Sequence, residues 1–158
     1  MSLHTIEIQI DEQFRSQVQR EALHLAALAP LIHQQMEEAC ELAVVVSDDK
    51  ALQALNLRYR DVDATTDVLA FPDEARGPFV GAPGQPRYLG DVVISFPRAV
   101  AQASEVGHAV EAEMQLLVIH GVLHLLGYDD VAEDQRARMW AIQTEILDAL
   151  DIEIAIPV

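Results

Sequence analysis

Hydrophobic and polar positions along the chain repeat in patterns that separate expected strands from expected helices. Thr5 to Ile10 alternates polar and apolar side chains with a period of two, which predicts a half-buried β-strand. Leu42 to Ser47 is apolar at almost every position, which is typical of a strand buried on both faces. Two further strands are expected from Thr66 to Phe71 and from Gly90 to Phe96. Each of these is followed directly by a proline, which cannot donate to a strand ladder.

Helices are expected in most of the remaining chain. Asp11 is a suitable N-cap for a helix from Glu12 to Leu28, and Pro30 is expected to begin a shorter helical stretch that reaches Cys40. Residues 73–88 hold three of the seven prolines and three of the seven glycines, so they are expected to form a loop. The other predicted helices follow a cap at Ser47 to Asp49 as far as Tyr59, and then span Arg98 to Val106, Ala109 to Leu126 and Ala132 to Leu150.

The order of these elements predicts the fold class. Strands and helices mix without strict alternation, which indicates an α/β fold with one mixed sheet. We expect a mixed sheet of about four strands packed with about five helices. The chain of 158 residues is of ordinary domain size and contains no repeat or low-complexity segment, so residues 1–158 are expected to form a single domain.

Composition limits where the protein is expected to work. No apolar run approaches the roughly 18 residues needed to span a bilayer, so no membrane partner is expected. The N-terminus lacks the basic start and apolar stretch of a signal peptide. Cys40 is the only cysteine and cannot form an internal disulfide, which favours a reducing, cytoplasmic location. We expect its thiol to be a small buried side chain rather than a nucleophile.

Charge qualifies the range of possible partners. The formal net charge of −16 would repel nucleic acid if it were spread evenly over the surface, and no DNA partner is expected. Between Asn56 and Arg98, however, five arginines oppose six acidic residues, a local net charge of about −1. All the basic residues of this stretch are arginines, which suit bidentate contacts to phosphate. We therefore expect this stretch to repel RNA less than the rest of the chain does.

Two histidines and an aspartate near the end of one expected helix form a candidate metal site. His120 and His124 are four residues apart, so both imidazoles lie on one helix face, as in helical HExxH zinc sites. Gly127 suits the positive φ that ends a helix, after which the chain can fold back and bring Asp130 toward the histidines. Three protein ligands leave a coordination position for water, which indicates a catalytic rather than a structural metal.

The residue after the first histidine limits the chemistry. In HExxH peptidases that residue is the glutamate that acts as general base, and here it is Gly121. A metal at this site could still polarise a phosphoryl oxygen, and a cation such as Arg60 could stabilise charge in the transition state. This combination favours phosphodiester cleavage, with Arg60 and His120 as the expected catalytic residues.

Three motifs between residues 55 and 130 carry a resemblance to a known family. His120 to Asp129 matches HGxLHLxGYD, Leu55 to Pro72 is similar to LNxxYRxxDxPTDVLSFP, and Leu89 to Ser95 is similar to LGDIxIS. These motifs resemble those of the YbeY endoribonuclease family of ribosomal RNA maturation factors. The resemblance implies a zinc-binding endoribonuclease specific for single-stranded RNA, which acts in ribosomal RNA maturation and ribosome quality control with the ribosome as partner. It also implies a functional role for Arg60.

Three positions depart from the family's motifs. The third ligand of the family is a histidine, and this chain has Asp130 there; Asp129, which matches the motif's own aspartate, is an alternative ligand. Two histidines and a carboxylate suit zinc, and they suit manganese or iron more than three histidines would. Thr65 replaces a proline and Ala70 replaces a serine, which is expected to alter the stiffness of a loop and one hydrogen bond.

The expected function is therefore that of a metal-dependent endoribonuclease. His120, His124 and Asp130 would hold one ion, and Arg60 would contact phosphate. The nucleophile is either water activated by the metal or the 2′-hydroxyl of the RNA. Two alternatives stay open, namely a zinc metallopeptidase and a non-enzymatic ribosome-assembly factor with a structural metal.

Other polar and aromatic residues receive ordinary interpretations. Asp67 and Asp91 adjoin expected strands, where they either line a cleft or cap turns. Trp140 is expected in the core. The remaining histidines are expected at the surface or as caps, namely His4, His24, His33 and His108.

Overall fold

The computed structural model describes residues 3–73 and 85–155. Most of the loop expected at 73–88 lies outside the described residues, as does Arg76. The described part of the chain contains one four-stranded sheet, five α-helices and a single 3-10 turn. The expected α/β fold with a mixed sheet is therefore confirmed.

The sheet has the strand order β1-β2-β4-β3. β1 (Thr5–Ile10) pairs in parallel with β2 (Cys40–Ser47), which pairs in parallel with β4 (Arg87–Ser95). The edge strand β3 (Val68–Pro72) runs antiparallel to β4. β2 lies inside the sheet, which is why its sequence is apolar on both faces, whereas the edge strand β1 keeps its alternation of exposed and buried positions.

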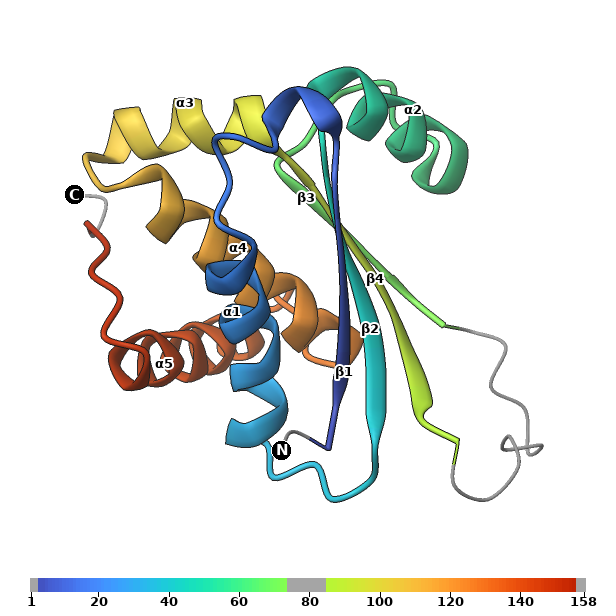
Figure 1. The fold of residues 1–158 in the computed structure, drawn as a ribbon, viewed down its shortest axis with the longest axis vertical. Helices are drawn as coiled ribbons and strands as arrows, with labels where there is room; N and C mark the ends of the chain where they lie inside the picture. Colours follow the sequence, from blue (N-terminus) through green and yellow to red (C-terminus); the bar gives the residue numbers. More distant parts are fainter. Residues whose placement is uncertain (1–2, 74–84, 156–158) are drawn as a thin grey trace.

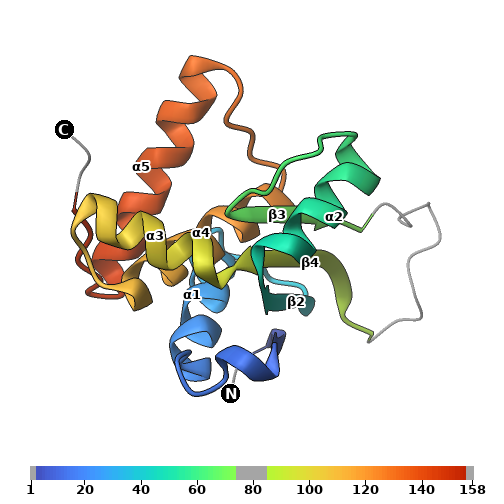
Figure 2. The same ribbon diagram turned by 90° about the horizontal axis from the view of Figure 1, so that it is seen from above.

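Helices lie on both faces of the sheet. α1 (Arg20–His33) and α4 (Val110–Leu125) cover one face, and α5 (Glu133–Ala149) packs against them on the side away from the strands (Figure 1). α2 (Asp49–Arg60) lies over the opposite face beside β3, as the view from above shows (Figure 2). α3 (Phe96–Val106) follows β4 directly and contacts α4.

Two hydrophobic clusters fix the position of α4 and α2. The larger cluster lies between the sheet and α1 and α4, where Val92 and Ile119 are completely buried. The smaller cluster joins Leu52 of α2 to Leu69 and Val93 on the other face. Because α4 is apolar on nearly every side, it is enclosed by its neighbours and can position side chains at its C-terminal end.

Side-chain caps set the first residues of α2 and α3. The Asp48 side chain accepts a hydrogen bond of 2.9 Å from the backbone N–H of Ala51. Ser95 Oγ accepts from the N–H of Arg98 at 3.3 Å, so β4 ends at Ser95 and α3 begins one residue later. Pro97 therefore lies in the first turn of α3, where the missing N–H needs no partner.

The helix expected from Glu12 to Leu28 is wrong. Glu12–Phe14 is a single 3-10 turn, and α1 begins only at Arg20. The Phe14 side chain is buried and its ring lies 4.9 Å from the ring of Phe96. This tertiary contact draws the segment into the core, and helix propensity does not extend the turn.

The helical stretch expected from Pro30 to Cys40 is also wrong. Pro30 lies inside the last turns of α1, and Cys40 begins β2. The helix ends because Gln35 adopts a left-handed φ of 53°. The N–H of Met36 then bonds to the carbonyl of Leu31 at 3.1 Å, which closes the helix end in a Schellman arrangement.

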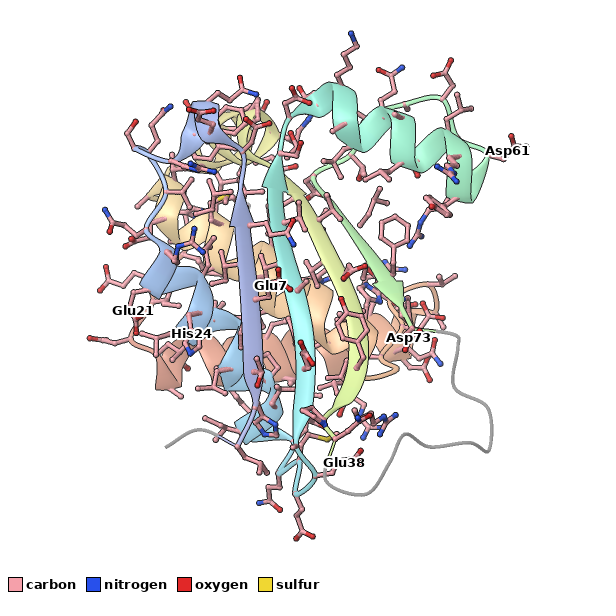
Figure 3. The ribbon with its side chains drawn as sticks, turned by 45° about the vertical axis from the view of Figure 1, so that its right-hand side comes forward. Glu7, Glu21, His24, Glu38, Asp61 and Asp73 are labelled. Carbon is pink, nitrogen blue, oxygen red and sulfur yellow. The ribbon has the colours of Figure 1, made fainter. Side chains whose placement is uncertain are left out.

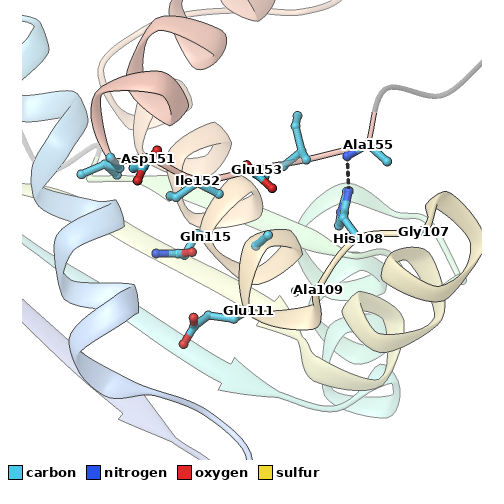
Figure 4. A pocket seen from close by; sticks show the side chains of 12 residues that line it. Gly107, His108, Ala109, Glu111, Gln115, Asp151, Ile152, Glu153 and Ala155 are labelled. Carbon is cyan, nitrogen blue, oxygen red and sulfur yellow. Dashed lines mark hydrogen bonds between the residues drawn. The ribbon is translucent and has the colours of Figure 1, made fainter.

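Two side chains lie elsewhere than expected. Trp140 is 42% exposed, because the buried stripe of α5 is formed by other residues. The side chain of His108 is only 7% exposed: its Nδ1 accepts from the N–H of Ala155 at 2.9 Å, and its Nε2 lies 3.4 Å from a carboxylate oxygen of Glu113. These contacts attach the C-terminal segment to the start of α4, beside a cavity of about 670 Å³ (Figure 4).

Acidic side chains are spread over several surfaces of the molecule. Glu7 stands on β1, Glu21 on α1 and Asp61 at the end of α2 (Figure 3). Within the part of the chain that the structure describes, acidic side chains therefore lie on several elements rather than on one. Within the described residues, no helix combines the length and the apolar character needed to cross a bilayer.

Candidate metal centre

His120 and His124 lie next to each other on the last turns of α4. Their ring centroids are 4.5 Å apart, and each side chain is 26% exposed. The neighbouring Ile119 and Leu123 are completely buried in the core. Packing of the apolar sides of α4 thus leaves the two imidazoles on the face that opens to solvent.

The loop after α4 returns toward the histidines. Gly127 has a φ of 102°, a left-handed conformation that favours glycine and turns the chain out of the helix. Asp129 Oδ1 then accepts from the N–H groups of Asp130 at 2.7 Å and Val131 at 3.2 Å, which forms a tight turn. This turn directs the Asp130 side chain back to the end of α4.

Three side chains converge at this point within the distances of one metal site. The Nε2 atoms of His120 and His124 are 3.0 Å apart. The carboxylate oxygens of Asp130 lie 3.4 Å from Nε2 of His120 and 3.7 Å from Nε2 of His124. Ligands at about 2.0–2.2 Å from a tetrahedral zinc would be separated by roughly 3.3–3.6 Å. The separations of 3.0, 3.4 and 3.7 Å lie around this range, so small side-chain shifts would fit the donor set to such an ion.

Asp130, rather than Asp129, joins the two histidines. Among the described residues, His120, His124 and Asp130 are the one group of histidine, cysteine and acidic side chains whose ligand atoms all lie within 4.8 Å of one another. Asp129 uses its carboxylate for the backbone of the turn. The arrangement therefore favours Asp130 as the third ligand, and metal binding itself stays a prediction.

A hydrogen-bond acceptor stands behind each imidazole. Nδ1 of His124 lies 2.9 Å from the backbone carbonyl oxygen of Tyr128, and Nδ1 of His120 lies 2.6 Å from Oε1 of Gln143 on α5. Gln143 is not among the site residues expected from the sequence. A signal for it exists, because Gln143 is the polar member of the buried stripe of α5, with Met139, Ile142, Ile146 and Leu147.

The surroundings of His124 favour its neutral form. Burial lowers the pKa of His124 below the ordinary histidine value, and the neighbouring His120 lowers this pKa further. The negative charge of Asp130 acts in the opposite direction. A neutral imidazole is the form that binds a metal ion, so the lowered pKa keeps His124 available as a ligand at neutral pH.

A cleft of about 390 Å³ connects these side chains to Arg60, the last residue of α2. One guanidinium nitrogen of Arg60, Nη2, donates to the backbone carbonyl of Ala70 at 3.1 Å. A guanidinium has five N–H donors, so this bond orients the group while leaving other donors for a ligand. Residues from α2, β3, α4 and the following loop therefore meet in one cleft.

Asp67 lines this cleft and also supports its wall. Its Oδ1 accepts from the N–H of Val68 at 2.8 Å, and its Oδ2 accepts from the side-chain amide of Gln102 at 3.2 Å. Asp91 instead lies on the face of the sheet that points away from α4, where it accepts a hydrogen bond from the Tyr88 hydroxyl. Of the two aspartates, only Asp67 belongs to the cleft.

Thr65 attaches the segment between α2 and β3 to the start of α2. Its hydroxyl donates to the backbone carbonyl of Asp49 at 2.9 Å, a bond that proline could not make. Nearby, the buried side chain of Asn56 donates to the carbonyl of Ala64 at 2.9 Å. These bonds hold the segment that leads into β3, where the carbonyl bound by Arg60 is located.

Comparison with known proteins identifies the family. The profile described as Endoribonuclease YbeY matches residues 2–151. The chain belongs to the YbeY family. Among its YbeY relatives, Endoribonuclease YbeY of Chloroflexus aurantiacus is 45% identical over 152 residues, which cover 95% of this chain and 97% of the relative. Endoribonuclease YbeY of Roseiflexus sp. (strain RS-1) is 42% identical over 153 residues, which cover 96% of each chain.

A solved structure supports the fold of this YbeY family member. The solution structure of a protein from Thermotoga maritima aligns with a TM-score of 0.57 and 20% sequence identity. The alignment covers 92% of this chain and 91% of the other. At this level of identity the likeness concerns the fold alone.

Proposed function

We propose that this YbeY family member is a metal-dependent endoribonuclease that cleaves single-stranded RNA in ribosomal RNA maturation and ribosome quality control. The observation that carries the proposal is the convergence of His120, His124 and Asp130 in the cleft that Arg60 also lines. Relatives over 40% identical bear the name Endoribonuclease YbeY, which supports RNA cleavage as the reaction.

The ligand set suits one divalent ion. His120 and His124 would bind through Nε2, and Asp130 through a carboxylate oxygen. Such an ion, when bound, supplies a Lewis acid that polarises a phosphoryl oxygen and makes water more acidic. Zinc fits this set, and the carboxylate makes manganese or iron alternatives.

The charge of the cleft gives a further reason for metal dependence. Its charged lining consists of Arg60, Asp67, Asp129 and Asp130, a net charge of −2 with neutral histidines. That charge repels a phosphodiester, and a divalent cation would balance it. We therefore expect the metal to be needed for RNA binding as well as for cleavage.

Arg60 is proposed to hold and stabilise the scissile phosphate. Its hydrogen bond to the Ala70 carbonyl orients the guanidinium in the cleft that the three candidate ligands also line. A planar fork of donors can bind two phosphate oxygens at once and can stabilise the charge that develops on them.

The two alternatives are less compatible with the site. In a metallopeptidase the general base would occupy position 121, but a Cβ atom there would lie 2.5 Å from Cγ1 of Val92, so a side chain would run into β4. A purely structural metal would not need an accessible site. Here the two imidazoles are 26% exposed and Asp130 is 39% exposed, beside an open cleft.

The test is cleavage of labelled single-stranded RNA, double-stranded RNA and single-stranded DNA by protein that is metal-loaded, chelator-treated or reloaded. We expect cleavage of the single-stranded RNA alone, its loss with chelator and its return with zinc or manganese. A His120→Ala/His124→Ala variant purified in parallel controls for contaminating ribonuclease. Cleavage that is equal in the variant, or chelator-sensitive digestion of casein without RNA cleavage, would contradict the proposal.

A further inference from the structure

Gln143 is a polar side chain in an otherwise apolar, buried helix face. It is 4% exposed, and the residues one turn before and after it, Met139 and Ile146, are each 1% exposed. Burying an amide costs free energy unless its hydrogen bonds are made. Its Oε1 lies 2.6 Å from Nδ1 of His120, so the amide is aimed at the back of a proposed metal ligand.

The tautomer of His124 is determined by its own partner. A backbone carbonyl oxygen only accepts hydrogen bonds, so the contact with Tyr128 requires a proton on Nδ1 of His124. In the neutral ring, Nε2 of His124 then carries a lone pair. That lone pair points into the site, 3.0 Å from Nε2 of His120.

His120 therefore has two possible arrangements. With its proton on Nε2, it would donate a hydrogen bond to Nε2 of His124, and neither of these atoms would be free for a metal. With its proton on Nδ1, it donates to Gln143, and both Nε2 lone pairs face the same point as Asp130. A metal ion can be bound only in the second arrangement.

We propose that Gln143 is a positioning residue that selects the metal-binding tautomer of His120. Its Oε1 accepts the Nδ1 proton and thereby prevents the two histidines from bonding to each other. This inference rests on the metal site of the proposed function. It adds a residue from α5, whose contribution is to free Nε2 of His120 without touching the ion or the RNA.

Two substitutions at this position separate the acceptor from the bulk of the side chain. Gln143→Met keeps the length of the side chain but removes the acceptor, so we expect zinc affinity to fall about 10- to 100-fold. Gln143→Glu keeps the acceptor and cannot present a donor in its ionised form, so we expect at least the wild-type affinity. Gln115→Met on α4 is the matched control, because it removes an amide that also bonds to a neighbouring helix: the Gln115 amide donates to the Ala22 carbonyl of α1.

Zinc affinity is measured by competition with a chromophoric chelator on folded, full-length variants. The tautomer is read separately from the ¹⁵N chemical shifts of the two ring nitrogens in the metal-free protein, at a pH where the rings are neutral. We expect the proton of His120 on Nδ1 in the wild type and in Gln143→Glu, and substantially on Nε2 in Gln143→Met. A change of packing alone would not move this proton.

The outcomes distinguish this inference from the proposed function. If the wild type binds no zinc, the proposed function fails. If the wild type and Gln143→Met bind zinc equally well, or if His120 of the metal-free wild type carries its proton on Nε2, the role of Gln143 is overturned. The second measurement needs no variant, so it holds even if Gln143→Met does not fold.

Discussion

Gly121 of α4 lies so close to Val92 of β4 that a Cβ atom on the glycine would be 2.5 Å from Cγ1 of the valine. The glycine thus allows α4 to approach the sheet at the level of the two histidines. A glycine at position 121 is therefore explained by packing. It also means that the residue after His120 cannot act as a general base.

This contact predicts a loss of stability in Gly121→Ala. Alanine favours a helix over glycine by about 1 kcal/mol, but forcing a methyl group into a packed core costs about 1–3 kcal/mol. We expect a net decrease in the free energy of unfolding, measured by denaturant titration. Val92→Ala should relieve the clash, so the double variant should be more stable than the sum of the two single changes predicts. Additive effects would show that the backbone moves instead.

Metal content is the most direct prediction for the site. We expect about one divalent ion per chain by elemental analysis and none in His120→Ala/His124→Ala. Because an ion bound to the folded state stabilises it, free metal at 100 times the dissociation constant should add about 2.7 kcal/mol to the free energy of unfolding. The melting temperature of the wild type should therefore drop on chelation, and that of the variant should not. The same trace metal in both proteins would refute the assignment.

Arg60 is expected to act on RNA rather than on stability. Arg60→Ala should lower RNA cleavage about 100-fold or more, since it removes a donor that stabilises transition-state charge. Arg60→Lys should also be impaired, because a point charge cannot replace the bidentate fork. The lost hydrogen bond to Ala70 should cost only about 1 kcal/mol of stability.

A control for this prediction lies on the same helix. Arg58 stacks over the ring of Tyr59 and does not line the cleft, so Arg58→Ala should cleave RNA almost like the wild type. If Arg60→Ala retained full RNA cleavage and lost only stability, the role of Arg60 would be limited to its structural hydrogen bond with Ala70 of β3.

Asp130 is the position where this chain leaves the family's motif. Asp130→Ala should weaken zinc binding by more than the roughly 10- to 100-fold that loss of an outer partner costs. Asp130→His should keep zinc but lose relative affinity for manganese, since a carboxylate suits harder ions better than an imidazole does. Both affinities are measured by chelator competition.

Asp129 provides the matched control for Asp130. Asp129→Asn keeps a side-chain oxygen for the turn at Asp130 and Val131 and removes the charge, so zinc affinity should change little. The opposite result, with Asp130→Ala unchanged and Asp129→Asn weakened, would make Asp129 the ligand.

Cys40 should be unreactive in the folded protein. Its side chain is completely buried, and its thiol donates to the carbonyl of Glu38 at 3.5 Å. Burial raises the pKa of Cys40, and the negative charge of Glu38 raises this pKa further. Because only the thiolate reacts, labelling by a thiol reagent should begin at a higher pH than for a free cysteine and should be fast after unfolding. Rapid stoichiometric labelling of the native protein would contradict this.

Much of the fold follows from the sequence by itself. Alternation and apolar runs predicted the four strands of the described sheet, and the caps and periodicity after residue 47 predicted α2 to α5 within a few residues. These signals are local, because a strand or a helix face is visible in a short window of residues. The same holds for His120 and His124, whose spacing of four residues places them side by side on any helix.

Tertiary structure decided the rest, because the deciding contacts join residues far apart in the chain. Burial of Phe14 against Phe96 shortened the first expected helix, and packing of α5 left Trp140 exposed. Likewise, the sequence placed Arg60 and Asp130 only as candidates, whereas the fold brings both into one cleft with the histidines. Gln143 is 23 residues from His120, and its contact with the imidazole exists only because α5 packs on α4.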